Sequence, residues 1–337
     1  MTIRLIMAFT AAFVVAAVVG KFYVPWLRKI KAGQEIKEIG PNWHKTKAGT
    51  PTMGGVIFIA AVTVAVLTVG IPDIAAGNRG ALFVLVFSLF YGAIGFLDDF
   101  EKLKKKQNLG LSARAKFLLQ LAVAVALLYL LRREGYLEAH LYIPFWDVTV
   151  GLPDWLYFVI AAFIVVGTVN AVNLTDGLDG LAASVTIPVM ICYTAVAFCW
   201  GMQYNSLGIF AAGLTGGLFG FLLYNFYPAK CFMGDTGSLF LGGAVCGLAF
   251  ALDMPLILVP LGIIYIIETL SDIIQVSYFK LTHGKRVFKM APFHHHLEMG
   301  GWTGHKWTEK QIVTLFTSVT IVFAVIAFFG CVHRFAA

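Results

Sequence analysis

Ten long apolar segments divide this chain of 337 residues. Most are close to the roughly 20 residues that a helix needs to cross a bilayer, and the eighth is short. Their apolar residues are continuous rather than alternating, which favours helices over a closed barrel. We therefore expect an all-α, polytopic membrane protein with ten transmembrane helices in a single integral membrane domain, residues 1–337. The segments are Leu5–Trp26, Thr52–Ile71, Ala81–Leu97, Ala115–Leu131, Trp155–Val172, Gly180–Trp200, Leu207–Asn225, Ser238–Leu252, Pro255–Tyr278 and Ile312–Gly330.

The composition excludes the other broad classes of protein. Apolar and aromatic residues make up 59% of the chain and charged residues only 13%, whereas soluble domains average about 25% charged. A soluble enzyme, a disordered chain and a secreted disulfide scaffold are all excluded. The five cysteines show no metal-ligand spacing, and the first apolar segment is too long for a signal peptide.

Basic residues predict which side of the membrane each loop faces. With ten helices, one side carries 19 Lys and Arg residues and the other five. The positive-inside rule makes the richer side cytoplasmic and places both termini outside. The net charge of +7 then reflects these loops and not binding of nucleic acid. We expect the cytoplasmic loops to form the active-site face: 27–51, 98–114, 173–179, 226–237 and 279–311. The external loop 132–154 is either a small β-hairpin or irregular.

A first polar cluster leaves the third apolar segment. Asp98 and Asp99 are adjacent carboxylates at a membrane boundary, where charges are costly unless they are paired or bind metal. Mg²⁺ binds carboxylates together with substrate phosphates. These two residues are therefore candidates for metal binding or base catalysis, with the lysines from Lys102 to Lys106 as phosphate ligands. The alternative is solvated charges beyond the end of a helix.

Two further clusters indicate a phosphate or metal site. Asn170, Asn173 and Asp176 recur every three residues before Gly177, so a continuing helix would place them on one face. Asp235 lies among glycine and hydroxyl residues at a helix start, which resembles a phosphate or metal site. The nearby Phe232 could stack on a base or be an interfacial aromatic.

The remaining polar motifs have simpler alternatives. Residues 45–55 enter the second apolar segment through Pro51, where free N–H groups could bind an anion or be capped by Thr50 or Thr52. The consecutive histidines His294, His295 and His296 could bind phosphate or a transition metal, or be a chance run.

Acidic residues also occur inside the ninth apolar segment. Glu268, Asp272 and Gln275 share one helix face, and the run is long enough that we expect it to tilt or break. Two hypotheses follow: a membrane enzyme acting on a phosphorylated, nucleotide-type substrate with Mg²⁺, or an ion-coupled transporter using these acids. The acids gather at one face and no internal repeat is evident, which favours the enzyme.

Five stretches together resemble one family. They are KAGTPTMGG (residues 47–55), GFLDDF (95–100), NAVNLTDGLDG (170–180), FMGDTGS (232–238) and APFHHHLE (291–298). In this order they are similar to the bacterial phospho-N-acetylmuramoyl-pentapeptide transferases, within the polyprenyl-phosphate sugar-1-phosphate transferase superfamily.

The resemblance implies a reaction and its setting. Phospho-N-acetylmuramoyl-pentapeptide would pass from UDP-N-acetylmuramoyl-pentapeptide to undecaprenyl phosphate, giving lipid I and UMP with Mg²⁺ as cofactor. This would be the first membrane step of peptidoglycan synthesis. The enzyme would be a homodimer in the bacterial plasma membrane, active at its cytoplasmic face. The alternative is the sister branch, which uses UDP-N-acetylhexosamines as donors of the sugar 1-phosphate.

The resemblance also implies roles for individual residues. Asp235 would bind Mg²⁺, Asp98 would act as base or hold the lipid phosphate, Asp99 would support the metal or the lipid phosphate, and Lys102 would balance charge. Asp176 and Gly177 would contact uracil, on which Phe232 would stack. The substrate cleft would be completed by Lys47, Thr52, Asn173, Asp179, Asn225, Gln275, Ala291, His294, His295 and His296. Direct attack by the lipid phosphate and a covalent route through an Asp nucleophile both stay open.

Overall fold

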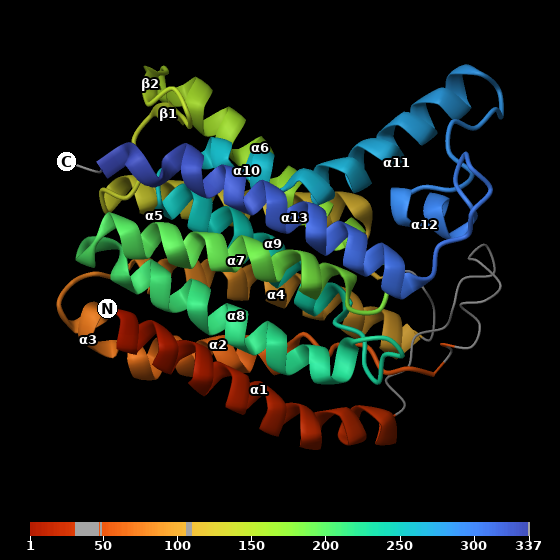
Figure 1. The fold of residues 1–337 in the computed structure, drawn as a ribbon, viewed down its shortest axis with the longest axis horizontal. Coiled ribbons are helices and arrows are strands. Elements are labelled where there is room, and N and C mark those ends of the chain that lie inside the picture. The colour runs from red at the N-terminus through yellow and green to blue at the C-terminus, as the bar shows by residue number, and fades with distance from the viewer. Residues whose placement is uncertain (31–46, 48, 106–109, 336–337) are drawn as a thin grey trace.

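A computed structural model describes the whole chain except residues 31–46, 48, 106–109 and 336–337. The described part is a bundle of helices with one small two-stranded sheet (Figure 1). The elements are α1 (Thr2–Lys29), α2 (Val56–Val69), α3 (Ile71–Ala75), α4 (Gly80–Lys105), α5 (Ala113–Arg133), β1 (His140–Ile143), β2 (Val148–Gly151), α6 (Asp154–Thr175), α7 (Leu181–Trp200), α8 (Asn205–Asn225), α9 (Gly234–Ala251), α10 (Leu258–Leu261), α11 (Ile263–Leu281), α12 (Phe293–Glu298) and α13 (Glu309–Cys331), with 3₁₀ turns at Met202–Tyr204, Pro255–Ile257 and Val332–Phe335.

The long helices define a multi-pass membrane protein. Among the described residues, eight helices are long and apolar enough to cross a bilayer, or nine if the bent pair α10–α11 is one span. They are α1, α4, α5, α6, α7, α8 with its preceding turn, α9, and α13 with its following turn. The apolar helix α2 is shorter, with 14 residues. Ten spans therefore stay a prediction.

Helix α9 lies at the centre of the bundle. It packs on α4 and α6, whereas α1 packs at the periphery on α2 and α8. Small residues allow the close contacts: a Cβ at Gly242 would lie 2.6 Å from Cα of Val169 in α6, and one at Gly216 would lie 2.0 Å from the carbonyl oxygen of Phe9 in α1. The predicted eighth segment is therefore an inner helix, and a short one suffices because its neighbours cover it.

The predicted break in the ninth apolar segment is confirmed. The chain bends by 80° between Pro255–Leu261 and Ile263–Leu281. The break falls at Gly262, two residues after a proline that cannot donate a helical hydrogen bond. Figure 1 shows α11 leading away from the bundle, with α12 beside its far end.

The two ends of the bundle differ. Both termini lie at one end, and α12 lies at the other (Figure 1). Strands β1 and β2 pair antiparallel, with His140 opposite Gly151, in the region where the sequence allowed a hairpin. The side of a membrane that each end faces stays a prediction.

One helix end differs from the sequence-based expectation and another agrees with it. Helix α4 continues to Lys105, eight residues past the expected end at Leu97, and its final lysines suit the negative end of a helix. Helix α9 begins at Gly234, before the apolar segment that starts at Ser238, and Asp235 lies in its first turn, as the polar motif predicts. Asp98 and Asp99 therefore lie on the last turns of a helix and not in a loop.

Candidate active site

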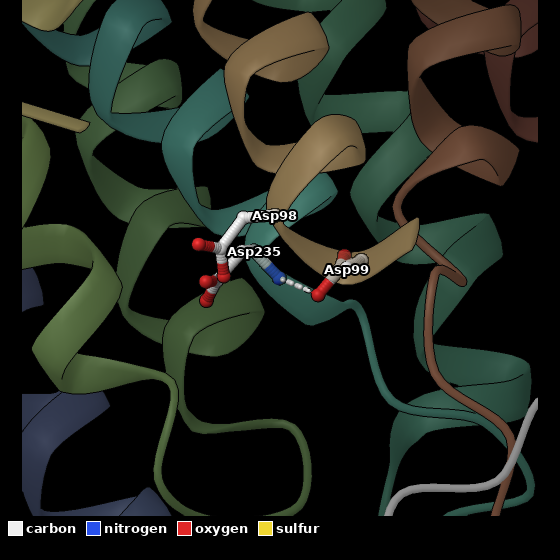
Figure 2. Close-up of side chains that lie close together, drawn as sticks. All are labelled: Asp98, Asp99 and Asp235. Atoms are coloured by element: carbon white, nitrogen blue, oxygen red, sulfur yellow. Dashed lines mark hydrogen bonds between the residues drawn. The ribbon is translucent and has the colours of Figure 1, made fainter. Parts of the chain in front are cut away.

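Three carboxylates from distant parts of the sequence meet at the carboxyl end of α4. Asp98 and Asp99 come from α4 and Asp235 from the first turn of α9 (Figure 2). One carboxylate oxygen from each lies within 4.8 Å of the others. Asp98 and Asp99 are each only 3% exposed. Such a set of hard oxygen ligands can hold a divalent cation.

Asp99 caps the amino end of α9. Its Oδ1 accepts a hydrogen bond from the backbone N–H of Asp235 at 3.2 Å, and its Oδ2 accepts from the N–H of Thr236 at 2.9 Å and from Thr236 Oγ1 at 2.7 Å. A carboxylate at a helix amino end also suits the helix dipole. Both Asp99 oxygens thus fix the start of α9 and, with it, the position of Asp235.

Gly234 is required at this junction. Its φ is +71°, a conformation that favours glycine. A Cβ there would lie 2.6 Å from Asp99 Oδ2 and 2.6 Å from Thr52 Oγ1. The structure therefore places Thr52, a predicted site residue, directly beside the carboxylate cluster.

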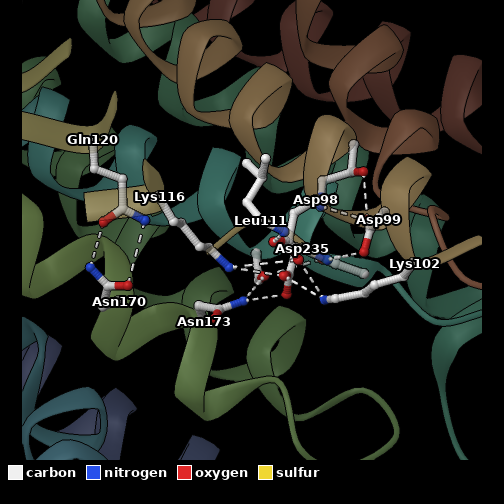
Figure 3. Close-up of polar contacts among 12 residues, drawn as sticks. Asp98, Asp99, Lys102, Leu111, Lys116, Gln120, Asn170, Asn173 and Asp235 are labelled. Carbon is white, nitrogen blue, oxygen red and sulfur yellow. Dashed lines mark hydrogen bonds and ion pairs between the residues drawn. The ribbon is translucent and has the colours of Figure 1, made fainter. Parts of the chain in front are cut away.

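Two lysines neutralise the other carboxylates (Figure 3). Lys102 Nζ lies 2.6 Å from Asp98 Oδ2 and 2.8 Å from Asp235 Oδ2. Lys116 Nζ, from α5, lies 2.9 Å from Asp235 Oδ2. Asn173 donates to Asp235 Oδ1 at 2.9 Å. The lysines place two positive charges where a phosphate could bind.

Lys116 was not among the predicted site residues. In the sequence it opens an apolar helix, so it reads as one of many loop charges. Only the packing of α5 beside α4 brings it to Asp235.

The loop after α6 carries Asp176 and Gly177 beside the carboxylates. Burial raises the pKa of Asp176 well above its usual range, and the negative charges of Asp235, Asp99 and Asp179 raise it further. Gly177 is exposed and packs against the ring of His294: a Cβ at Gly177 would lie 2.3 Å from His294 Nε2.

A second ionic cluster ties the ends of four segments together. Lys47 Nζ lies 2.7 Å from both Asp179 Oδ1 and Glu309 Oε2. The N–H of Asp179 donates to Glu309 Oε2, and Asp179 Oδ2 accepts from the N–H of Ala229. The predicted residues Lys47 and Asp179 are thus brought together. The third member, Glu309, was missed because an acid in the first turn of a helix reads as an ordinary N-terminal charge.

Backbone pairing brings Phe232 to the segment before α2. The N–H of Phe232 donates to the carbonyl of Pro51 at 2.8 Å, and the N–H of Gly54 donates to the carbonyl of Phe232 at 2.8 Å. Asn225 donates to the carbonyl of Cys231 at 2.9 Å. The predicted residues Thr52, Asn225 and Phe232 therefore lie in one substructure next to the start of α9.

The three histidines have different hydrogen-bond partners. His294 contacts Glu268, His295 Nδ1 pairs with Glu298 Oε2 at 2.7 Å, and His296 Nδ1 accepts from the N–H of Lys289. Burial lowers the pKa of His296, and the charge of Lys289 lowers it further. Its ring packs on that of Trp302, 4.5 Å away. His296 thus belongs to the small core of the segment after α11.

The other predicted residues of this segment have local surroundings. Gln275 Oε1 accepts the N–H groups of Val287 and Phe288, which fixes the chain as it leaves α11. Ala291 is half-buried, two residues before α12. The contacts in the described residues do not join either of them to the carboxylate cluster.

The family matches place this bundle of membrane helices, with its carboxylates and lysines clustered at one end, in a class of membrane-embedded transferases. Residues 81–253 match the family described as glycosyl transferase family 4, and residues 47–59 match phospho-N-acetylmuramoyl-pentapeptide-transferase signature 1.

Curated relatives define the family more narrowly. The chain is 46% identical over 323 residues to the phospho-N-acetylmuramoyl-pentapeptide-transferase of Clostridium acetobutylicum, covering 95% of this chain and 97% of the relative. It is 45% identical over 327 residues to the protein of that name from Caldanaerobacter subterraneus subsp. tengcongensis, covering 97% and 98%. This chain belongs to the phospho-N-acetylmuramoyl-pentapeptide-transferase family and is an enzyme.

Proposed function

We propose that this enzyme transfers phospho-N-acetylmuramoyl-pentapeptide from its UDP carrier to undecaprenyl phosphate, giving lipid I and UMP. One observation carries the proposal: Lys102 and Lys116 converge on Asp98 and Asp235 at the end of a membrane helix bundle. Phosphoryl transfer depends mainly on positioning and on charge stabilisation, which such a set of groups supplies. The names of the relatives support the choice of substrates.

In the proposed reaction, an oxygen of the lipid phosphate attacks the β-phosphorus of the UDP-linked substrate. The bond from that phosphorus to the bridging oxygen breaks, and UMP leaves with the electron pair. Asp98 acts as base on the lipid phosphate or holds it in line. Lys102 and Lys116 bind phosphate oxygens and offset the growing negative charge.

The cluster fits Mg²⁺ through Asp98 and Asp235. Their Oδ2 atoms already share one cationic partner, the ammonium of Lys102, so both face a point where positive charge is stabilised. Asp99 is less suited, because both its oxygens bind the start of α9. Bound Mg²⁺ would act as a Lewis acid on the pyrophosphate oxygens.

The nucleotide end of the substrate is assigned to the neighbouring loops. Asp176 and Gly177 contact uracil, and Phe232 stacks on it. The raised pKa of Asp176 favours the protonated carboxyl, which can both donate a hydrogen bond to the edge of a base and accept one from it. The remaining predicted residues line the cleft or hold its loops: Lys47, Thr52, Asn173, Asp179, Asn225, Gln275, Ala291, His294, His295 and His296.

We infer the membrane side of the active site and the oligomeric state from the sequence and the family. We place the active site on the cytoplasmic face of the bacterial plasma membrane, because the basic loops are predicted there. The cytoplasmic loops together with the helices form one integral domain. We also propose a homodimer, on the basis of the family resemblance.

The proposal is tested with purified enzyme, undecaprenyl phosphate and Mg²⁺. UDP-N-acetylmuramoyl-pentapeptide and UDP-N-acetylglucosamine are offered in parallel, and UMP release and lipid product are measured. We expect turnover with the first donor only. Preference for the second would place the enzyme in the sister branch. A phospho-enzyme trapped on Asp98 would contradict direct attack.

A further inference from the structure

A buried acid from the membrane part of the protein reaches the active-site loops. Glu268 lies on α11 and is 0% exposed, and its partner His294, at the start of α12, is 1% exposed. Glu268 Oε2 lies 2.9 Å from His294 Nδ1, and Glu268 Oε1 accepts the backbone N–H of His294 at 3.2 Å. Both oxygens of this carboxylate are thus directed to one residue.

This contact determines which nitrogen of the His294 ring carries the hydrogen. An ionised carboxylate can only accept hydrogen bonds. The hydrogen between Glu268 Oε2 and the His294 ring must therefore be carried by Nδ1. His294 Nε2 is buried and has no hydrogen-bond partner among the described residues. It faces Gly177, where a Cβ would lie only 2.3 Å away. A hydrogen on Nε2 would be a buried donor without an acceptor, which is costly, so Nε2 carries a lone pair.

We infer that Glu268 is a positioning residue that holds His294 in the tautomer whose unprotonated Nε2 faces Gly177 and the nucleotide cleft. Glu268 acts through His294 and does not itself touch the substrate. The inference rests on the proposed function, because activity is one of its readouts. It also accounts for a buried membrane carboxylate whose role the sequence left open.

The Glu268→Gln variant separates this role from a purely structural one. Glutamine keeps the volume and can still accept the backbone N–H of His294 with its oxygen. Its amide nitrogen then faces Nδ1 as a donor, so the ring must move its hydrogen to Nε2 to keep the hydrogen bond. The variant therefore reverses the tautomer while it preserves the packing.

The first readout is the ¹⁵N spectrum of the full-length protein, labelled at its eight histidines. We expect His294, assigned by its loss in the His294→Asn variant, to show a protonated Nδ1 in the native protein and a protonated Nε2 in Glu268→Gln. The matched control is Glu298→Gln, the same change in the neighbouring pair with His295. The rings of His294 and His295 lie 4.1 Å apart, so the control should move the His295 signals and shift those of His294 slightly, while the hydrogen of His294 stays on Nδ1.

The second readout is a double-mutant cycle on transfer activity. If Glu268 acts through His294, Glu268→Gln should lower kcat/KM by at least about tenfold in the native background and by less than about twofold in His294→Asn. Unchanged His294 signals in Glu268→Gln, or equal losses in both backgrounds, would overturn the inference. An inactive native enzyme would instead contradict the proposed function, and the spectra would still test the tautomer.

Discussion

The contact between Asp99 and α9 leads to a specific prediction for the Asp99→Asn variant. In the native protein the carboxylate accepts three hydrogen bonds from Asp235 and Thr236. In the variant the amide oxygen can still accept the two bonds from Thr236. The amide nitrogen then faces the backbone N–H of Asp235, so two donors oppose each other.

The size of the effect follows from these contacts. Hydrogen bonds to a charged group contribute about 1.5–3 kcal/mol each, and a buried donor left without an acceptor costs about 1–3 kcal/mol. The negative charge at the helix amino end adds about 0.3–1 kcal/mol. Because Asp99 is buried, solvent does not replace the lost acceptor. We expect Asp99→Asn to lower the free energy of unfolding by about 2–3 kcal/mol.

The matched control is Asp98→Asn, the same change one residue away. Asp98 Oδ1 accepts the N–H of Leu111 at 2.9 Å, which an amide oxygen also does, and Lys102 keeps its pairing with Asp235. The variant loses the pair with Lys102 but also removes a buried charge that is costly to desolvate, so we expect a smaller loss of stability than for Asp99→Asn. Unfolding in mixed micelles, followed by tryptophan fluorescence, measures both variants. Equal stability of the two variants would refute the capping role of Asp99.

Three further predictions address activity, packing and pH. Asp235→Asn should abolish transfer while its unfolding curve stays near that of the native protein, and an active variant would contradict a metal ligand at this position. Gly95→Ala should be destabilised and lose activity, because the new Cβ would lie 2.1 Å from the carbonyl oxygen of Asp235. Gly167→Ala, where a Cβ meets nothing within 4 Å, should unfold like the native protein or gain up to about 1 kcal/mol. The lowered pKa of His296 means that its contribution to stability is complete above the usual histidine pKa of about 6.5 and is lost as the pH falls below it. Melting temperatures between about pH 7.5 and pH 5.5 should therefore fall more steeply for the native protein than for His296→Asn, and parallel slopes would contradict this.

The sequence predicts the membrane helices well because their signal is local. The length of an apolar run and the charges at its ends are properties of the run itself. The break in the ninth segment was also predictable, since the run exceeds the bilayer thickness and contains Pro260 and Gly262. The candidate site was predictable to the extent that dense polar motifs are unusual in an apolar chain.

The exact helix ends depended on tertiary contacts that the sequence does not show. Helix α9 starts at Gly234 because Asp99, 136 residues away, accepts its first N–H groups. The polar motif around Asp235 predicts a helix start, but not the distant carboxylate that caps it. Lys116 and Glu309 were missed for the same reason, since each looks like a boundary charge until the packing of its helix is known.

The histidine run shows a different limit. Successive residues in a helix point about 100° apart, so three consecutive side chains cannot share one face. The structure directs His294 to Glu268, His295 to Glu298 and His296 to the aromatic core around Trp302. The sequence predicted α-helix for the neighbouring segments but gave no reason to expect a helix at 293–298.

The contacts of Asp99 and Asp235 explain why two neighbouring carboxylates should affect stability and activity differently. Asp99 binds backbone N–H groups, which nothing that enters the cleft can replace. Asp235 binds two lysine ammonium groups and one amide, all at the ends of side chains that can turn towards a phosphate. The fixed contacts hold the position of the Asp235 backbone, and the exchangeable ones keep its charge compensated. A substitution at Asp99 should therefore mainly lower the free energy of unfolding, whereas one at Asp235 should mainly lower the rate of transfer.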